Sequence, residues 1–100
     1  MQRHFTYILC SKKNGTLYTG VTRNLPRRIY EHQHKLTPGF ASKYNLFILV
    51  HVEEFSLMMD AVKREKVLKT WKRAWKIHLI EQHNPEWKDL SDCLLFTSNE

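Results

Sequence analysis

The sequence predicts an α+β fold, a small three-stranded antiparallel sheet flanked by helices. Two β-rich runs flank an Asn-Gly pair near the start, a run of branched and aromatic residues stands mid-chain, and helical periodicity fills much of the rest. The expected order is strand, strand, helix, strand, helix, helix. One hundred residues suffice for one modest core, so we expect a single domain over residues 1–100, with its core at about 5–90 and a tail at 91–100.

The first two strands form a predicted hairpin. "FTYILC" and "TLYTGV" are β-rich, and "SKKNG" between them contains the pair that most favours a tight turn. A two-residue turn at Asn14 and Gly15 would place Tyr7 opposite Thr22. Because side chains alternate along a strand, Tyr7 and Tyr18 would then share one face.

A glycine on that face suggests a ligand site. The same register places Gly20 beside the two tyrosines, where it would leave a gap in which a ligand could approach the backbone. The alternative is simple core packing, because tyrosine is a good strand residue. The hairpin alone leaves both interpretations open.

A helix is predicted over "TRNLPRRIYEHQHKL". Asn24 is placed to cap it, Pro26 falls in its first turn, and apolar residues follow at helical spacing: Leu25, Ile29 and Leu36. "TPGFASKYN" is turn-rich and reads as a loop. "LFILVHVEEF" alternates only at its end, which suggests a central strand covered on both faces.

Residues 56–84 have a helical pattern, with Ser56 as the candidate cap and Pro85 as the stop. The apolar stripe shifts along this segment, so we expect a break between Thr70 and Arg73. The three tryptophans are most simply core or helix-packing residues: Trp71, Trp75 and Trp87. Base stacking by one of them is the less favoured alternative.

The charge favours an anionic partner. Sixteen Lys and Arg against ten Asp and Glu give a net charge of +6, which suits nucleic acid first and an acidic membrane surface second. Some small basic proteins bind neither. Cys10 and Cys93 are too few for a disulfide framework, and the N-terminus resembles neither a signal peptide nor a membrane span, so we expect a cytoplasmic protein.

Glu65 is a carboxylate at a position that the helical pattern predicts to be buried. On a helical wheel it lies within the apolar stripe expected to face the sheet. Burying an unpaired carboxylate costs several kcal/mol, about 3 or more, so it needs a cationic partner or a metal ion. An internal salt bridge is one interpretation. The other is Mg²⁺, which binds few carboxylates and keeps several waters.

Arg28 and His32 are neighbours on one helical face, since they are four residues apart. Arginine can grip phosphate with two donors, and histidine can donate a hydrogen bond or transfer a proton. Taken singly, two surface residues at this spacing are more often solvated than functional. No His pair recurs at metal-ligand spacing, so no zinc site is proposed.

Together these residues resemble the GIY-YIG nuclease family over about residues 5–90. "LYTG", "RRIYEH", "AVKREKVLK" and "NPEWKDL" match family segments in order, although "FTY" stands where the family has "GIY". The resemblance implies five catalytic residues, with Glu65 as metal ligand: Tyr7, Tyr18, Arg28, His32 and Glu65. It also places Asn84 near a family asparagine that shapes the site.

The resemblance implies an endonuclease that hydrolyses DNA phosphodiester bonds with Mg²⁺, for which Mn²⁺ could substitute. We expect structure-directed or weakly selective cleavage in DNA repair or processing, no small-molecule cofactor, no membrane partner, and a monomer or weak homo-oligomer. The expected nucleic-acid contacts are Gly20, Lys69, Lys72, Arg73, Lys76 and Asn84. Alternatives are a non-catalytic nucleic-acid-binding module and a protein-interaction adaptor.

Overall fold

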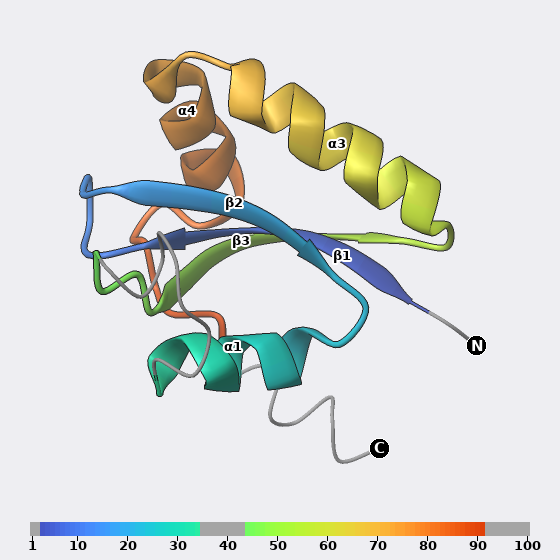
Figure 1. Ribbon diagram of the computed structural model, residues 1–100. Helices are drawn as coiled ribbons and strands as arrows, with labels where there is room; N and C mark the ends of the chain where they lie inside the picture. Colours follow the sequence, from blue (N-terminus) through green and yellow to red (C-terminus); the bar gives the residue numbers. More distant parts are fainter. Residues whose placement is uncertain (1–2, 35–43, 92–100) are drawn as a thin grey trace.

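The computed structural model describes residues 3–34 and 44–91, and it has the predicted α+β class and element order. The elements are β1 (His4–Cys10), β2 (Leu17–Thr22), α1 (Leu25–Gln33), β3 (Ile48–Phe55), α3 (Met58–Thr70) and α4 (Arg73–His83). The sheet is a layer between α1 and α3 (Figure 1). The predictions for Leu36, for most of the 37–45 loop, for Cys93 and for the tail beyond residue 91 lie outside the described residues. Within the described parts, no helix has the length and apolarity needed to cross a membrane.

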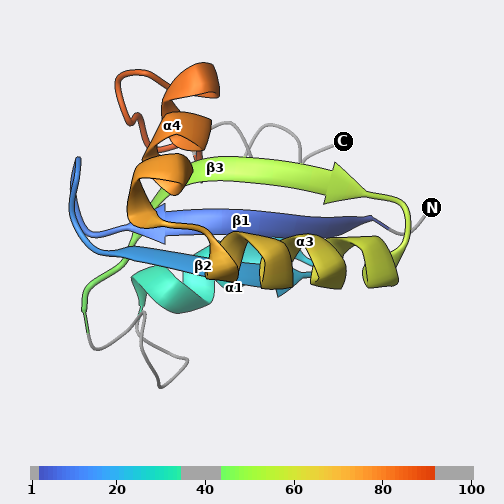
Figure 2. The same ribbon diagram turned by 90° about the horizontal axis from the view of Figure 1, so that it is seen from above.

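The sheet is antiparallel, with strand order β2-β1-β3 (Figure 2). All seven residues of β1 are buried, because this strand is paired on both sides and covered on both faces. The prediction that "LFILVHVEEF" is the central strand is therefore wrong. That run is apolar because the first half of β3 is buried, while its second half emerges toward solvent at the sheet edge.

The hairpin turn is longer than predicted. The backbone N–H of Gly15 donates to the Lys12 carbonyl at 2.8 Å, and Asn14 takes the left-handed conformation with φ 61°. The turn therefore holds four residues, and Tyr7 pairs with Gly20 instead of Thr22. A shift of two residues preserves side-chain direction, so the two tyrosines still share a face.

The long helical segment breaks where predicted. α3 ends at Thr70 and α4 begins at Arg73, while Trp71 and Lys72 between them have extended backbone, with ψ of 148° and 149°. The predicted cap at Ser56 is wrong, because Leu57 occupies the cap position and its side chain makes no capping hydrogen bond. The first turn of α3 is joined to the sheet by the Thr6 hydroxyl of β1, which donates to the Ala61 carbonyl at 2.7 Å.

An ion pair sets the rotation of α3 on the sheet. Arg64 donates to both carboxylate oxygens of Glu53 on β3, at 2.8 and 3.1 Å, and His51 adds a 2.8 Å contact. Burial alone would raise the pKa of Glu53, but the hydrogen bonds from His51 and Arg64 lower it to about 2. With Arg64 turned toward β3, the next residue, Glu65, lies on the opposite flank of the buried stripe, toward β2.

Asn84 fastens α4 to the sheet. Its side-chain Nδ2 donates to the Val50 carbonyl at 3.2 Å and to the Lys88 carbonyl at 2.9 Å, and its Oδ1 accepts from the Lys88 N–H at 3.0 Å. The side chain is buried. Asn84 thus joins the end of α4, β3 and the segment that follows the helix.

Replacing Asn84 with alanine should lower the free energy of unfolding by about 2–3 kcal/mol, because it leaves buried backbone groups without partners. Urea denaturation followed by circular dichroism measures this loss. The matched control is Gln82→Ala on the exposed side of α4, which should change stability by less than about 0.5 kcal/mol. Equal stabilities of the two variants would contradict this role for Asn84.

Candidate active site

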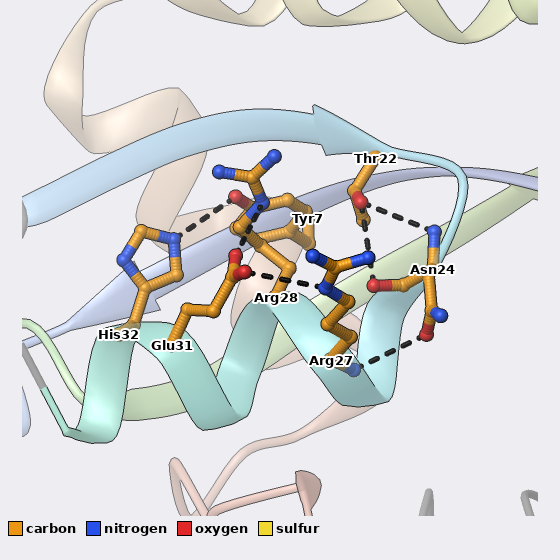
Figure 3. A network of polar contacts seen from close by, with 7 residues as sticks. All are labelled: Tyr7, Thr22, Asn24, Arg27, Arg28, Glu31 and His32. Atoms are coloured by element: carbon orange, nitrogen blue, oxygen red, sulfur yellow. Dashed lines mark hydrogen bonds and ion pairs between the residues drawn. The ribbon is translucent and has the colours of Figure 1, made fainter. Parts of the chain in front are cut away.

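Three aromatic side chains from three elements meet on the face of the sheet covered by α1. Tyr7 comes from β1, Tyr18 from β2 and His32 from α1, and their ring centroids lie 5.8 to 6.4 Å apart. The hydroxyl of Tyr7 and Nε2 of His32 are hydrogen-bonded at 3.2 Å (Figure 3). The two predicted tyrosines and the predicted histidine therefore form one cluster.

Gly20 makes this cluster sterically possible. It lies directly across from Tyr7, and a Cβ at this position would lie 2.5 Å from the Tyr7 hydroxyl and 3.0 Å from the Tyr18 ring. The space over Gly20 is thus filled by Tyr7. The prediction that a nucleic-acid backbone contacts Gly20 is wrong, because a side chain of the protein occupies that gap.

The cap and the buried side of α1 direct its functional residues. Asn24 caps the helix by accepting from the Arg27 N–H at 3.2 Å, as predicted, and Leu25 and Ile29 are buried against the sheet. This rotation turns Arg28 and His32 toward Tyr7 (Figure 3). His32 is only 4% exposed, whereas the side chain of Arg28 is 38% exposed and accessible to a ligand.

Burial controls the protonation of the Tyr7–His32 pair. Burial raises the pKa of Tyr7, as do the charges of Glu65 and Glu31, while Arg28 opposes this rise. Burial and then Arg28 lower the pKa of His32, and within the described residues its Nδ1 has no hydrogen-bond partner. At neutral pH the resting pair is therefore a neutral phenol beside a neutral imidazole.

Glu31 is a site residue that the sequence reasoning missed. Its carboxylate lies 3.3 Å from Arg27 Nε and 3.7 Å from Arg28 Nε (Figure 3). A pocket of about 390 Å³ adjoins this ion-pair cluster, and Arg23 also lines it. The sequence does contain a sign of this ion-pair cluster. Glu31 stands four residues after Arg27 and three after Arg28, and both spacings bring side chains together on a helix.

Glu65 approaches the cluster from α3, on the other side of the sheet. Its side chain is 16% exposed, and its carboxylate lies 3.2 Å from the ammonium group of Lys69. Its charge reaches the aromatic cluster, since it helps to raise the pKa of Tyr7. The expected salt bridge is therefore present, and a catalytic role for Glu65 stays a prediction.

The donor set around Glu65 suits Mg²⁺ better than zinc. No group of three or more His, Cys, Asp or Glu side chains is arranged to hold a metal ion in residues 3–34 and 44–91. A single carboxylate is the kind of protein contribution that Mg²⁺ accepts when waters and a substrate phosphate complete its shell. Glu65 therefore fits the ligand role expected of it.

The other predicted nucleic-acid contacts do not join the cluster. The Arg73 guanidinium donates to the carbonyls of Asn14 and Gly15 at 2.7 and 2.6 Å, which ties α4 to the hairpin turn. Lys72 lies over the Trp75 ring. Asn84 was predicted to contact nucleic acid, which is wrong because its buried side chain is held by backbone groups. Its predicted role in shaping the site stays a prediction.

The structure thus defines an α+β domain whose antiparallel sheet lies between helices and carries a cluster of two tyrosines and a histidine beside an arginine. Residues 3–78 match the GIY-YIG catalytic domain, and the chain belongs to this family of endonucleases. The predicted resemblance is confirmed.

Its relatives include small proteins of similar length. The chain is 40% identical over 88 residues to a UPF0213 protein of Syntrophus aciditrophicus, covering 86% of this chain and 98% of the relative. It is 35% identical over 82 residues to a UPF0213 protein of Staphylococcus haemolyticus, covering 82% and 99%. The solution NMR structure of a UPF0213 protein from Bacillus halodurans superposes with a TM-score of 0.55 at 28% identity, covering 87% of this chain and 92% of that one.

Replacing Gly20 with alanine should displace the Tyr7 ring and cost about 1–3 kcal/mol of stability, because the added methyl group overpacks the site. Denaturation measures the cost, and the NMR signals of the His32 imidazole report the displacement. The control is Val21→Ala, since the next residue on β2 points to the opposite face. Unchanged imidazole signals in Gly20→Ala would contradict the steric role of the glycine.

His32 should make the fold sensitive to mild acid. Its folded pKa lies below the ordinary value of 6.5, so the unfolded chain binds the proton more readily. Stability is therefore complete above pH 6.5 and falls as the pH drops from there toward the folded pKa. Denaturation curves can be recorded between pH 7.5 and pH 5, roughly one unit or more on either side of an ordinary histidine pKa. The free energy of unfolding should fall less over this range in His32→Gln than in the wild type.

The exposed His34 provides the matched control for this experiment. His34→Gln should retain the loss of stability that the wild type shows in acid, because the substitution leaves His32 and its buried surroundings unchanged. If His32→Gln and wild type lose stability in parallel, His32 is not the titrating group.

Proposed function

We propose that this protein is a metal-dependent endonuclease that hydrolyses phosphodiester bonds in DNA. The observation that carries the proposal is the hydrogen-bonded Tyr7–His32 pair beside the accessible Arg28, with the Glu65 carboxylate close enough to influence it. Hydrolysis of a phosphodiester requires a positioned water, charge stabilisation at the phosphoryl oxygens and help for the leaving oxygen. These residues supply a group for each requirement.

Arg28 is the phosphate-binding group. In the free protein its guanidinium is loosely paired with Glu31 at 3.7 Å, a separation longer than a good hydrogen bond. A phosphate can therefore take both donors of the guanidinium in a two-pronged contact. Glu31 would meanwhile keep its closer partner, Arg27.

Tyr7 and His32 would act together on the proton of the attacking water. Since burial raises the pKa of Tyr7, a free phenolate is unfavourable there. The neutral His32 at 3.2 Å can accept the Tyr7 proton as Tyr7 takes one from the water. Tyr18 is less buried than Tyr7, and it lies where it can orient that water beside the pair.

Glu65 would hold the divalent cation. When bound, Mg²⁺, or Mn²⁺ in its place, would supply positive charge against the leaving 3′ oxygen. Lys69 would give up its ion pair with Glu65 and remain available for a neighbouring phosphate. The net charge of +6 supports a DNA partner, and we propose structure-directed or weakly selective cleavage in cytoplasmic DNA repair or processing.

Cleavage assays on branched, single-stranded and duplex DNA with Mg²⁺ or Mn²⁺ test this proposal. Glu65→Gln and Arg28→Ala should each lower the cleavage rate by about 100-fold or more, because each removes charge stabilisation in the transition state. The matched control is Glu54→Gln, an exposed carboxylate paired with Arg3, which should cleave at the wild-type rate. Cleavage that persists in Glu65→Gln or in excess EDTA would contradict the assignment.

A non-catalytic nucleic-acid-binding module gives a different result. In that case the wild type would bind DNA with strong salt dependence, yet cleave no substrate with either metal. Glu65→Gln would then leave affinity unchanged or raise it by removing a negative charge.

A further inference from the structure

An exposed aromatic groove lies on α4, away from the tyrosine cluster. Trp75 was predicted to be a core or helix-packing residue, and the core assignment is wrong because the residue is 53% exposed. Trp87, by contrast, is buried as predicted. Trp75 meets Trp71 edge to face at 6.2 Å, and they border a groove of about 380 Å³ whose lining residues are Trp71, Trp75, His78, Leu79 and Gln82.

Basic side chains predominate around this groove, and the one carboxylate of α4, Glu81, accepts a hydrogen bond from Trp87 Nε1. Residues 69–80 contain four Lys or Arg side chains and no Asp or Glu: Lys69, Lys72, Arg73 and Lys76. The ammonium group of Lys72 lies 5.7 Å from the Trp75 ring centroid. An apolar protein partner would have to cover these cations, whereas a polyanion with flat, stackable groups matches both features.

We propose that this groove binds an unpaired base of a nucleic-acid strand. The base would stack on the exposed Trp75 ring, Lys72 and Lys76 would contact the adjacent phosphates, and Gln82 and His78 would face the edge of the base. Bases inside a duplex already stack on each other, so an indole platform selects single-stranded segments. The inference rests on the proposed function only in taking DNA as the partner.

The groove follows Glu65 along the α3–α4 segment. Glu65 and Lys69 form an ion pair on α3, and Lys72 follows at the break before α4. At about 1.5 Å of rise per residue, Glu65 stands roughly 8 Å before the end of α3. A strand leaving Glu65 would pass Lys69 and Lys72 and reach Trp75, and this path would place cleavage next to an unpaired segment.

The test measures binding of a fluorescein-labelled single-stranded oligothymidylate by anisotropy in EDTA, which blocks metal-dependent cleavage. Trp75→Ala should weaken binding about fivefold or more, because it removes one base-stacking contact. Trp75→Phe should retain most of the affinity. Removing the groove cations in Lys72→Ala should weaken binding and reduce its salt dependence.

Two substitutions elsewhere serve as controls. Lys88→Ala removes a charge of the same type from a site paired with Glu86, and Val67→Ala truncates an exposed apolar residue on α3. Both should bind single strands within about twofold of the wild type, since surface changes away from the contact are nearly neutral. Circular dichroism checks folding, and Trp75→Phe and Lys72→Ala still test the groove if Trp75→Ala unfolds.

The results separate this inference from the proposed function. Cleavage by the wild type together with unchanged single-strand affinity in Trp75→Ala would overturn the groove and leave the nuclease intact. Weaker binding in Trp75→Ala in a protein that cleaves nothing would support the groove and contradict the nuclease. If Trp75→Ala instead dissociates a wild-type dimer in gel filtration without affecting binding, the groove is a contact between copies and the inference fails.

Discussion

The rest of the site depends on the close contact between the Tyr7 ring and Gly20. β1 is the central strand and is buried along its whole length, so the backbone of Tyr7 is held in one position. Its hydroxyl can reach His32 on α1 only because the opposite residue on β2 has no side chain. One contact thus links both strands of the hairpin to the helix, and the environment of His32 and the neighbours of Arg28 follow from it.

The charges of the site are already paired within the protein. Glu31 lies between Arg27 and Arg28, and Glu65 is paired with Lys69. These pairs are partly exposed, so each contributes little to stability and is inexpensive to exchange. The Glu53–Arg64 pair is different, because both of its side chains are half-buried and two hydrogen bonds between them hold α3 in place. The protein therefore keeps one ion pair for structure and leaves the others free to respond to a phosphate or a cation.

Local patterns predicted the elements well, because capping at Asn24, helical periodicity and β-rich runs act over a few residues. The predictions that failed required long-range information. The hairpin register depended on the conformation of the turn, and the order of the strands depended on which strand β1 pairs with. The shared face of the tyrosines survived the register error because the shift was even. Gly20 and Asn84 were predicted to contact nucleic acid because no local pattern shows their partners within the protein. Tyr7 fills the space over Gly20, and a backbone carbonyl accepts from the Asn84 side chain.

Successive parts of the α3–α4 segment face different parts of the molecule. Arg64 is bound to β3, Glu65 lies on the flank toward β2, and the extended backbone at Trp71 and Lys72 redirects the chain. A continuous helix would carry the rotation of α3 directly into Trp75, at 100° per residue. The break separates the two rotations, so α4 can bury Leu79 and Ile80 against the sheet while Trp75 faces solvent. The same break that ends the sheet-facing stripe of α3 thus creates an aromatic surface next to the basic residues of this segment.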